Sequence, residues 1–282
     1  MRKKIENATF DEERALYHLF DTDVVSCTFA GPADGESALK ESHGVALTDC
    51  TFSLRYPLWH ATDFSLRRVR MDELTRAPIW YAARGKLSEC TVEGVKCLRE
   101  CEDVEFSHCE LLSEEFGWRC RRISLTDCTL RSQYLLFECR DLSLARIKMS
   151  GKYSFQYVEN MEIRDSYLDT KDAFWHAKNV TVYDSVVKGE YLGWYSENLR
   201  LVRCHIVGTQ PLCYCRGLVL EDCTMEGTDL AFEYSDVNAD VRGSIDSVKN
   251  PRSGRVVADV IGEVILNSDV MEIRGVVETR AK

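Results

Sequence analysis

The sequence predicts an all-β protein, a single-stranded right-handed parallel β-helix with capped ends and about 12 coils of about 19 residues. Three observations predict this solenoid. Small side chains recur at a constant interval, short apolar–polar–apolar segments precede them, and turn-forming residues keep the same interval at another phase. Together these patterns indicate stacked coils, each made of short strands joined by turns.

The first repeated column consists of small side chains, mostly cysteines. The step between neighbours is the same throughout, and its members are Cys90, Cys109, Cys128, Ile147, Ser166, Ser185, Cys204 and Cys223. Segments such as Ile-Ser-Leu-Thr-Asp at 123–127 lead into it and favour strands. Repeats built from pairs of helices need about 33 to 47 residues, so this shorter period excludes them.

A second column of small residues supports the same fold. Its members are Cys101, Cys120, Cys139, Val158, Ala177, Ser196 and Cys215. Two positions earlier lies a column of mostly large side chains, namely Trp59, Trp80, Arg99, Trp118, Phe137, Gln156, Trp175, Trp194, Cys213 and Phe232. We expect both columns to point inward, because alternating large and small side chains would fill a narrow coil at close-packed density.

The turns and the ends complete the prediction of one domain over residues 1–282. Glycine, asparagine and aspartate recur where tight turns are needed, and no linker rich in glycine, serine or proline interrupts them. Residues 24–236 are expected to form the regular coils.

Both ends are expected to be caps, because end coils of a solenoid expose core and strand edges. Residues 1–23 are predicted to form the N-terminal cap or first coil, with a helical turn at 11–15. The phase is lost beyond Asp236, so residues 237–282 are predicted to form the C-terminal cap, with a loop at 245–254.

Composition narrows the possible partners and cofactors. The formal net charge of −10 disfavours nucleic acid and anionic membrane surfaces as partners. No apolar segment has the length of a membrane span or the position of a secretion signal. The 13 cysteines lack the paired CxxC spacing of zinc sites, so we expect no metal and no other cofactor. Stacked cysteines could form disulfides, so a reducing, cytoplasmic location is expected.

Several motifs resemble one bacterial family. They are Leu-Lys-Glu-Ser at 39–42, Tyr-Pro-Leu-Trp at 56–59, Asp-Ala-Phe-Trp at 172–175, Gly-Glu-Tyr-Leu-Gly-Trp at 189–194, Ala-Phe-Glu-Tyr-Ser at 231–235 and Ile-Asp-Ser-Val-Lys-Asn-Pro at 245–251. In nearly its whole length the chain resembles the proteins grouped as domain of unknown function 3737. The resemblance implies a right-handed β-helix of the pectin-lyase type, and it implies no activity and no catalytic residues.

An aromatic stripe is the strongest candidate for a ligand site. It consists of Tyr157, His176, Tyr195 and Tyr214, which repeat at the interval of the coils and are expected to face outward, with Glu138 before and Glu233 after them in the same column. Such rings suit sugars, which offer apolar faces and hydroxyl groups together. Stacking that merely stabilises the sheet is the alternative explanation. Whether residues 30–42 or a neighbouring chain cover the stripe stays open.

Catalytic candidates are weaker. Asp165 and Asp184 are expected on adjacent coils about 5 Å apart, a spacing that fits a retaining glycosidase, although a ladder of alternating charges explains them as well. His176 is the one histidine with a candidate acid–base role. The triplets Asn238-Ala-Asp240 and Arg146-Ile-Lys148 resemble polygalacturonase elements, but the paired aspartates and the His-Gly element of that family are missing.

The sequence therefore supports three hypotheses. The first is a cytoplasmic β-helix that binds a carbohydrate-like ligand on the aromatic stripe. The second is a hydrolase or lyase that acts on a saccharide, although no recognisable catalytic motif is present. The third is a structural or protein-interaction solenoid, for which a homo-oligomer would be a natural state.

Overall fold

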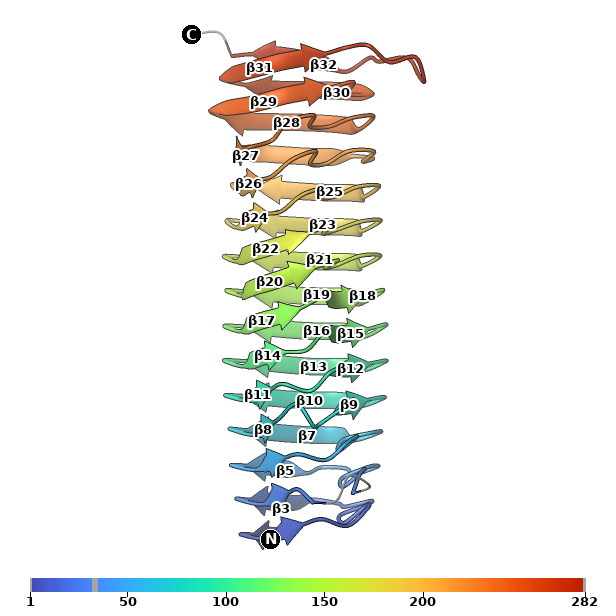
Figure 1. Ribbon diagram of the computed structural model, residues 1–282, viewed down its shortest axis with the longest axis vertical. Helices are drawn as coiled ribbons and strands as arrows, with labels where there is room; N and C mark the ends of the chain where they lie inside the picture. Colours follow the sequence, from blue (N-terminus) through green and yellow to red (C-terminus); the bar gives the residue numbers. More distant parts are fainter. Residues whose placement is uncertain (1, 32–34, 281–282) are drawn as a thin grey trace. The chain divides into compact units, whose positions relative to one another are not determined.

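The computed structural model describes residues 2–31 and 35–280, which form about 14 turns of a right-handed parallel β-solenoid and no helix (Figure 1). The predicted fold class is confirmed, with slightly more coils than the expected 12. No helix of the described residues is long and apolar enough to cross a membrane. Parts of the predicted caps (residues 1 and 281–282) and of the segment 30–42 (residues 32–34) lie outside the described residues.

The chain divides into two compact units, Met1–Ser143 and Leu144–Lys282. One domain over residues 1–282 stays a prediction. Strand β19 (Arg140–Ala145) contains the boundary between the units.

The first unit contains three columns of parallel strands. The first column is β1 (Lys3–Glu6), β3 (Thr22–Val25), β5 (Ala46–Thr48), β7 (Thr62–Arg67), β10 (Ala83–Ser88), β13 (Glu102–Ser107) and β16 (Arg121–Thr126). The second is β2 (Thr9–Phe10), β4 (Thr28–Phe29), β6 (Thr51–Phe52), β8 (Arg70–Met71), β11 (Thr91–Val92), β14 (Glu110–Leu112) and β17 (Thr129–Ser132). The third is β9 (Ile79–Trp80), β12 (Leu98–Arg99), β15 (Glu115–Trp118) and β18 (Tyr134–Phe137).

The second unit keeps two of these columns. The first is β21 (Glu159–Arg164), β23 (Lys178–Tyr183), β25 (Glu197–Val202), β27 (Leu218–Glu226), β28 (Asp236–Arg242), β30 (Ser253–Ala258) and β32 (Val276–Thr279). The second is β20 (Lys148–Lys152), β22 (Tyr167–Lys171), β24 (Val186–Lys188) and β26 (His205–Val207), and β29 (Ser244–Lys249) pairs with β31 (Val260–Ile265). Tight turns replace the third column of strands.

The interior confirms the two predicted columns of small residues. All 13 cysteines are buried and none is in a disulfide. Many of their thiols donate to backbone carbonyls of their own coil, of the preceding coil or of both, as Cys101 does to the carbonyl oxygen of Ile79 at 3.1 Å. The polar members follow the same rule, since the hydroxyl of Ser166 donates to the carbonyl of Arg164 at 2.6 Å. Thiols and hydroxyls in these two columns can therefore fill the coil and still form hydrogen bonds.

Two predictions about the ends are wrong. Residues 11–15 form turns and no helix, because the first coil already follows the regular register, with Lys3 opposite Thr22. The predicted loop at 245–254 contains β29, and coils continue beyond Asp236. The register explains the error: Asp236 lies opposite Ser253, so this coil is shorter than the regular ones and loses the period while keeping the stack.

Candidate functional site

The aromatic stripe lies on tight turns of the second unit and not on a strand as expected. Its residues have positive φ angles, for example 54° at His176 and 59° at Tyr195. A hydrogen bond closes each of two turns, from the amide of Ala177 to the carbonyl of Phe174 and from Ser196 to Gly193, both at 3.1 Å. A positive φ at the third position of a four-residue turn is the type II geometry. This backbone geometry directs the ring outward.

The four rings form one parallel ladder. Ring centroids are 4.8 Å apart for Tyr157 and His176, 5.1 Å for His176 and Tyr195, and 4.8 Å for Tyr195 and Tyr214, with interplanar angles of 7°, 8° and 11°. These centroid distances exceed the roughly 3.5–4.0 Å separation of touching carbon atoms, so the rings are offset and part of each face stays uncovered. Tyr157 is 49% exposed and Tyr195 is 44% exposed.

A second ladder runs beside the stripe, and its position corrects the expected inward tryptophan column. Trp175 and Trp194 stack at 5.5 Å and 4°, are only half-buried, and donate from Nε1 to the carbonyls of Tyr191 and Gln210 at 2.7 and 2.8 Å. The turn is again the cause. Because Phe174 and His176 both have positive φ, simple alternation fails, so Phe174 fills the interior and Trp175 does not.

The stripe continues to Tyr234, which the sequence pattern missed. The Tyr234 ring lies 5.9 Å from that of Tyr214. An extra residue within 226–229 shifts the register: the amide of Tyr195 bonds the carbonyl of Cys213, whereas the amide of Tyr214 bonds that of Glu233, one position further along than the same step predicts. Glu233 therefore lies one position before the stripe, which corrects its predicted place in it; Cys213 has the same place one coil earlier, and Trp194 has it two coils earlier. The tyrosine at position 234 is a signal that the sequence offers, but a strict 19-residue period passes over it.

The pKa of Tyr214, near the Tyr234 end of the stripe, is shifted by its surroundings. Burial and the neighbouring carboxylate of Glu233 raise the pKa of Tyr214 to about 12. Glu233 is itself mostly buried and forms an ion pair with Lys249, in which Oε1 lies 2.8 Å from Nζ. This pair raises the pKa of Lys249. The Tyr214 hydroxyl therefore stays protonated and can donate a hydrogen bond over the whole physiological pH range.

Polar ladders flank the stripe on the following strands. The amide of Asn179 donates to the side-chain oxygen of Asn160 at 3.2 Å, and Asn198 donates to Asn179 at 3.0 Å. Lys178 pairs with Glu197 at 3.5 Å. The coils of Tyr157, His176 and Tyr195 thus each present an aromatic ring and a side-chain amide at the same interval, whereas the coil of Tyr214 has Gly217 in place of the asparagine.

The catalytic candidates Asp165 and Asp184 lie on a separate shallow depression of about 730 Å³, lined also by Arg146, Lys148 and Tyr167. Asp184 is engaged by Arg203, whose Nε and Nη2 donate to its two oxygens at 2.6 and 2.7 Å. This guanidinium holds the pKa of Asp184 below its usual range. A carboxylate with a lowered pKa is a poor general acid, so the geometry does not favour Asp184 in that role. Its catalytic role stays a prediction, which normal turnover by Asp184→Asn would refute.

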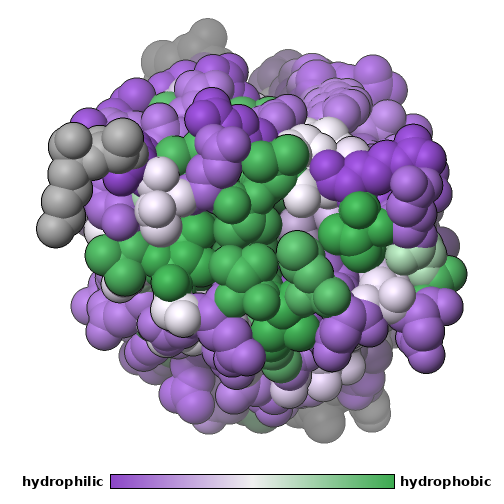
Figure 2. All heavy atoms as spheres, turned by 90° about the horizontal axis from the view of Figure 1, so that it is seen from above, coloured by the Kyte–Doolittle hydropathy of each residue, from purple (hydrophilic) through white to green (hydrophobic). Residues whose placement is uncertain are grey.

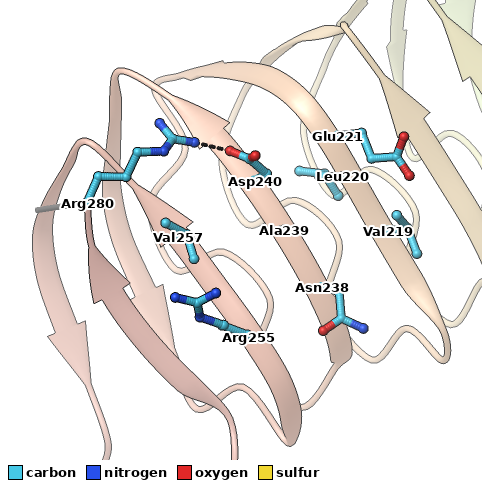
Figure 3. A pocket seen from close by; sticks show the side chains of 9 residues that line it. All are labelled: Val219, Leu220, Glu221, Asn238, Ala239, Asp240, Arg255, Val257 and Arg280. Carbon is cyan, nitrogen blue, oxygen red and sulfur yellow. Dashed lines mark hydrogen bonds and ion pairs between the residues drawn. The ribbon is translucent and has the colours of Figure 1, made fainter.

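A second depression, of about 510 Å³, lies over β27, β28 and β30 and includes Asn238 and Asp240 (Figure 3). Its charges are already paired. Arg280 contacts Asp240, Arg255 donates to Glu278 at 2.7 Å, and Glu221 accepts from Arg200 at 2.8 Å. A charged ligand would have to displace one of these ion pairs.

Glu138 belongs to the first unit, where it is exposed in the corresponding turn, and its role as a ligand contact stays a prediction. Among residues 2–31 and 35–280, no group of three or more histidine, cysteine, aspartate or glutamate side chains could hold a metal ion. The site as described therefore consists of rings, hydroxyls and amides.

The family described as "protein of unknown function (DUF3737)" matches residues 3–277. No curated protein matches the sequence significantly. Among solved structures, the chain is similar to HetL, a pentapeptide repeat protein of the cyanobacterium Nostoc, at 14% identity and a TM-score of 0.37, over 78% of this chain and 92% of that one. It is similar to PfbA, a surface adhesin of Streptococcus pneumoniae, at 8% identity and a TM-score of 0.41, over 98% and 91%. It is also similar to a mannuronic acid-specific polysaccharide lyase from human gut microbiota, at 11% identity and a TM-score of 0.39, over 95% and 74%. Likeness at these values carries no argument about function.

Proposed function

Since the chain belongs to this family of proteins of unknown function, we propose from its geometry alone that the aromatic stripe binds a carbohydrate chain. One observation carries the proposal: four offset rings repeat at 4.8–5.1 Å along a partly exposed surface. This interval is comparable with the length of one pyranose ring along an extended glycan. Successive coils could then contact successive sugars.

The fold does not require rings at these turns. In the first unit the corresponding turns have the same backbone geometry with Glu100, Arg119 and Glu138, whose φ angles are 49°, 52° and 53°. Charged side chains therefore satisfy the turn as well as tyrosine does. Stacking of four aromatics in succession is a property of the second unit's sequence and not of its backbone, which supports a ligand role.

The chemistry of the stripe matches sugars. The uncovered edges of the rings offer apolar contact to sugar C–H groups, and the tyrosine hydroxyls and the His176 imidazole offer hydrogen bonds. The asparagine ladder adds amide donors and acceptors at the same interval. Binding would be shallow, as expected for a surface that follows a polymer rather than encloses a small molecule.

The first unit provides a matched control. His60 and Tyr81 stack at 5.0 Å and 17°, much as His176 and Tyr195 do at 5.1 Å and 8°. We expect His176→Ala/Tyr195→Ala to lose glycan binding by at least about tenfold on an oligosaccharide array and in calorimetry, because two central contacts are removed. His60→Ala/Tyr81→Ala should leave binding unchanged. Equal binding by both double variants would refute the site.

We also propose that the protein works in a reducing compartment, the cytoplasm. The 13 buried thiols support this, since oxidation would join stacked neighbours. Disulfides found by mass spectrometry in protein isolated from cells without reductant would contradict it.

A further inference from the structure

The last coils of the second unit expose an unusual amount of apolar surface. Six exposed apolar side chains lie close together in this part of the sequence: Val260, Val264, Leu266, Val270, Met271 and Val276. Figure 2, which views the C-terminal end, shows hydrophobic atoms gathered across its centre. Contiguous exposed apolar patches on soluble proteins usually mark interaction sites.

The same end has strand edges without neighbours. Within the described part of the chain, β31 pairs with β29 alone and β32 pairs with β30 alone. Their outer backbone groups therefore lie open to a further strand. Natural proteins normally cover or charge such edges, because an open apolar edge readily joins another chain.

Three ion pairs lie around the patch. Arg274 pairs with Glu272 at 2.5 Å, Arg255 with Glu278 at 2.7 Å, and Arg280 with Asp259 at 2.5 Å. Burying these three pairs would leave none of their charges isolated, whereas the exposed Glu263 and Asp269 would have to stay at the edge of an interface.

The polarity of the other end identifies the partner. In the first unit, the open edge strand β1 exposes Lys3, Lys4 and Glu6, as a soluble cap should. Burying these charges against aliphatic side chains would cost desolvation energy. The apolar end is best covered by a surface of its own kind, and a second copy supplies one.

We propose that residues 260–276 form the interface of a two-fold symmetric dimer, joined through the C-terminal ends of two chains. A two-fold axis brings the two β31 edges together in antiparallel orientation, and symmetric dimers are the commonest closed assembly. The proposal is independent of glycan binding by the aromatic stripe.

Sedimentation equilibrium tests the dimer. Wild-type protein should be dimeric at about 100 μM, and Leu266→Lys should raise the dissociation constant at least about tenfold, because an exposed leucine becomes a buried charge. Leu74→Lys is the matched control, since Leu74 is 62% exposed and Leu266 is 59% exposed. Both variants should keep the wild-type circular dichroism spectrum and melting behaviour of the monomer. Added salt should strengthen association, because each chain carries a net charge of −10.

Fluorescence transfer identifies the ends involved. All native cysteines are buried, so a dye would react with an introduced surface cysteine. Transfer between copies labelled at Asp269→Cys, and none between copies labelled at Glu12→Cys, is expected. A monomer at about 100 μM, a dimer that survives Leu266→Lys, or transfer between position 269 and position 12 in open-ended polymers would overturn the proposal.

Discussion

Gly193 begins the turn that carries Trp194 and Tyr195, and replacing it with alanine tests how this turn is built. Its φ is 75°, and an added Cβ would lie 2.7 Å from Cδ2 of Leu212 and 3.1 Å from Cδ2 of Leu199. Two costs arise. The backbone conformation disfavours a side chain by about 1 kcal/mol, and overpacking against the leucines adds about 1–3 kcal/mol.

The free energy of unfolding should therefore fall by about 2–4 kcal/mol, which lowers the melting temperature by about 4 °C or more. Gly243→Ala separates the two costs. Gly243 has a φ of 78° but nothing within 4 Å of an added Cβ, so this control should show only the backbone cost of about 1 kcal/mol.

Thermal unfolding followed by circular dichroism gives the comparison, and Leu212→Ala provides the rescue. Alone, Leu212→Ala leaves a cavity and costs about 2–5 kcal/mol. Combined with Gly193→Ala it should cost less than the sum by about 1 kcal/mol or more, because the new methyl group occupies the vacated space. Strict additivity, or equal losses for Gly193→Ala and Gly243→Ala, would refute the crowding explanation.

Three further outcomes follow from the charges and thiols. In an absorbance titration, Tyr214 should ionise near pH 12, and this transition should be absent in Tyr214→Phe. Because the pKa of Tyr214 is raised from 10.0 in the folded protein, the free energy of unfolding should fall as the pH rises from about 10 to about 12. Ionisation of every tyrosine near pH 10 would contradict this. In an NMR titration, Arg203→Gln should raise the pKa of Asp184 toward 3.8. The stabilisation by the ion pair of Arg203 and Asp184 is present above pH 3.8 and is lost as the pH falls through the lowered pKa of Asp184. An unchanged titration of this carboxyl group in the variant would show that the ion pair does not form. A thiol reagent should modify none of the 13 cysteines quickly before unfolding, because burial raises the pKa of thiols such as Cys101, and rapid modification of the native protein would be inconsistent with the buried columns.

The sequence predicted the parts of the fold that obey one period. The cysteine columns and the stripe from Tyr157 to Tyr214 were found because strands of equal spacing stack in register. Backbone dihedral angles are not visible in that period. Phe174 and His176 adopt positive φ without being glycine, which directs Trp175 outward against the expected alternation.

Local changes in coil length caused the other errors. One inserted residue places Tyr234 in the stripe and moves Glu233 beside Lys249, and a shortened coil hides β29. Such changes preserve stacking, since each coil needs only a neighbour of similar cross-section. They destroy the fixed spacing on which a count along the sequence depends.

A crystal structure of the protein soaked with a mixed set of oligosaccharides would test the central proposal most directly. We expect sugar density along the ladder of Tyr157, His176, Tyr195 and Tyr214, with successive sugar rings beside successive coils. Sugar bound only in the depression of Asp165 and Asp184, or an aromatic stripe covered by a neighbouring chain and without sugar, would contradict it.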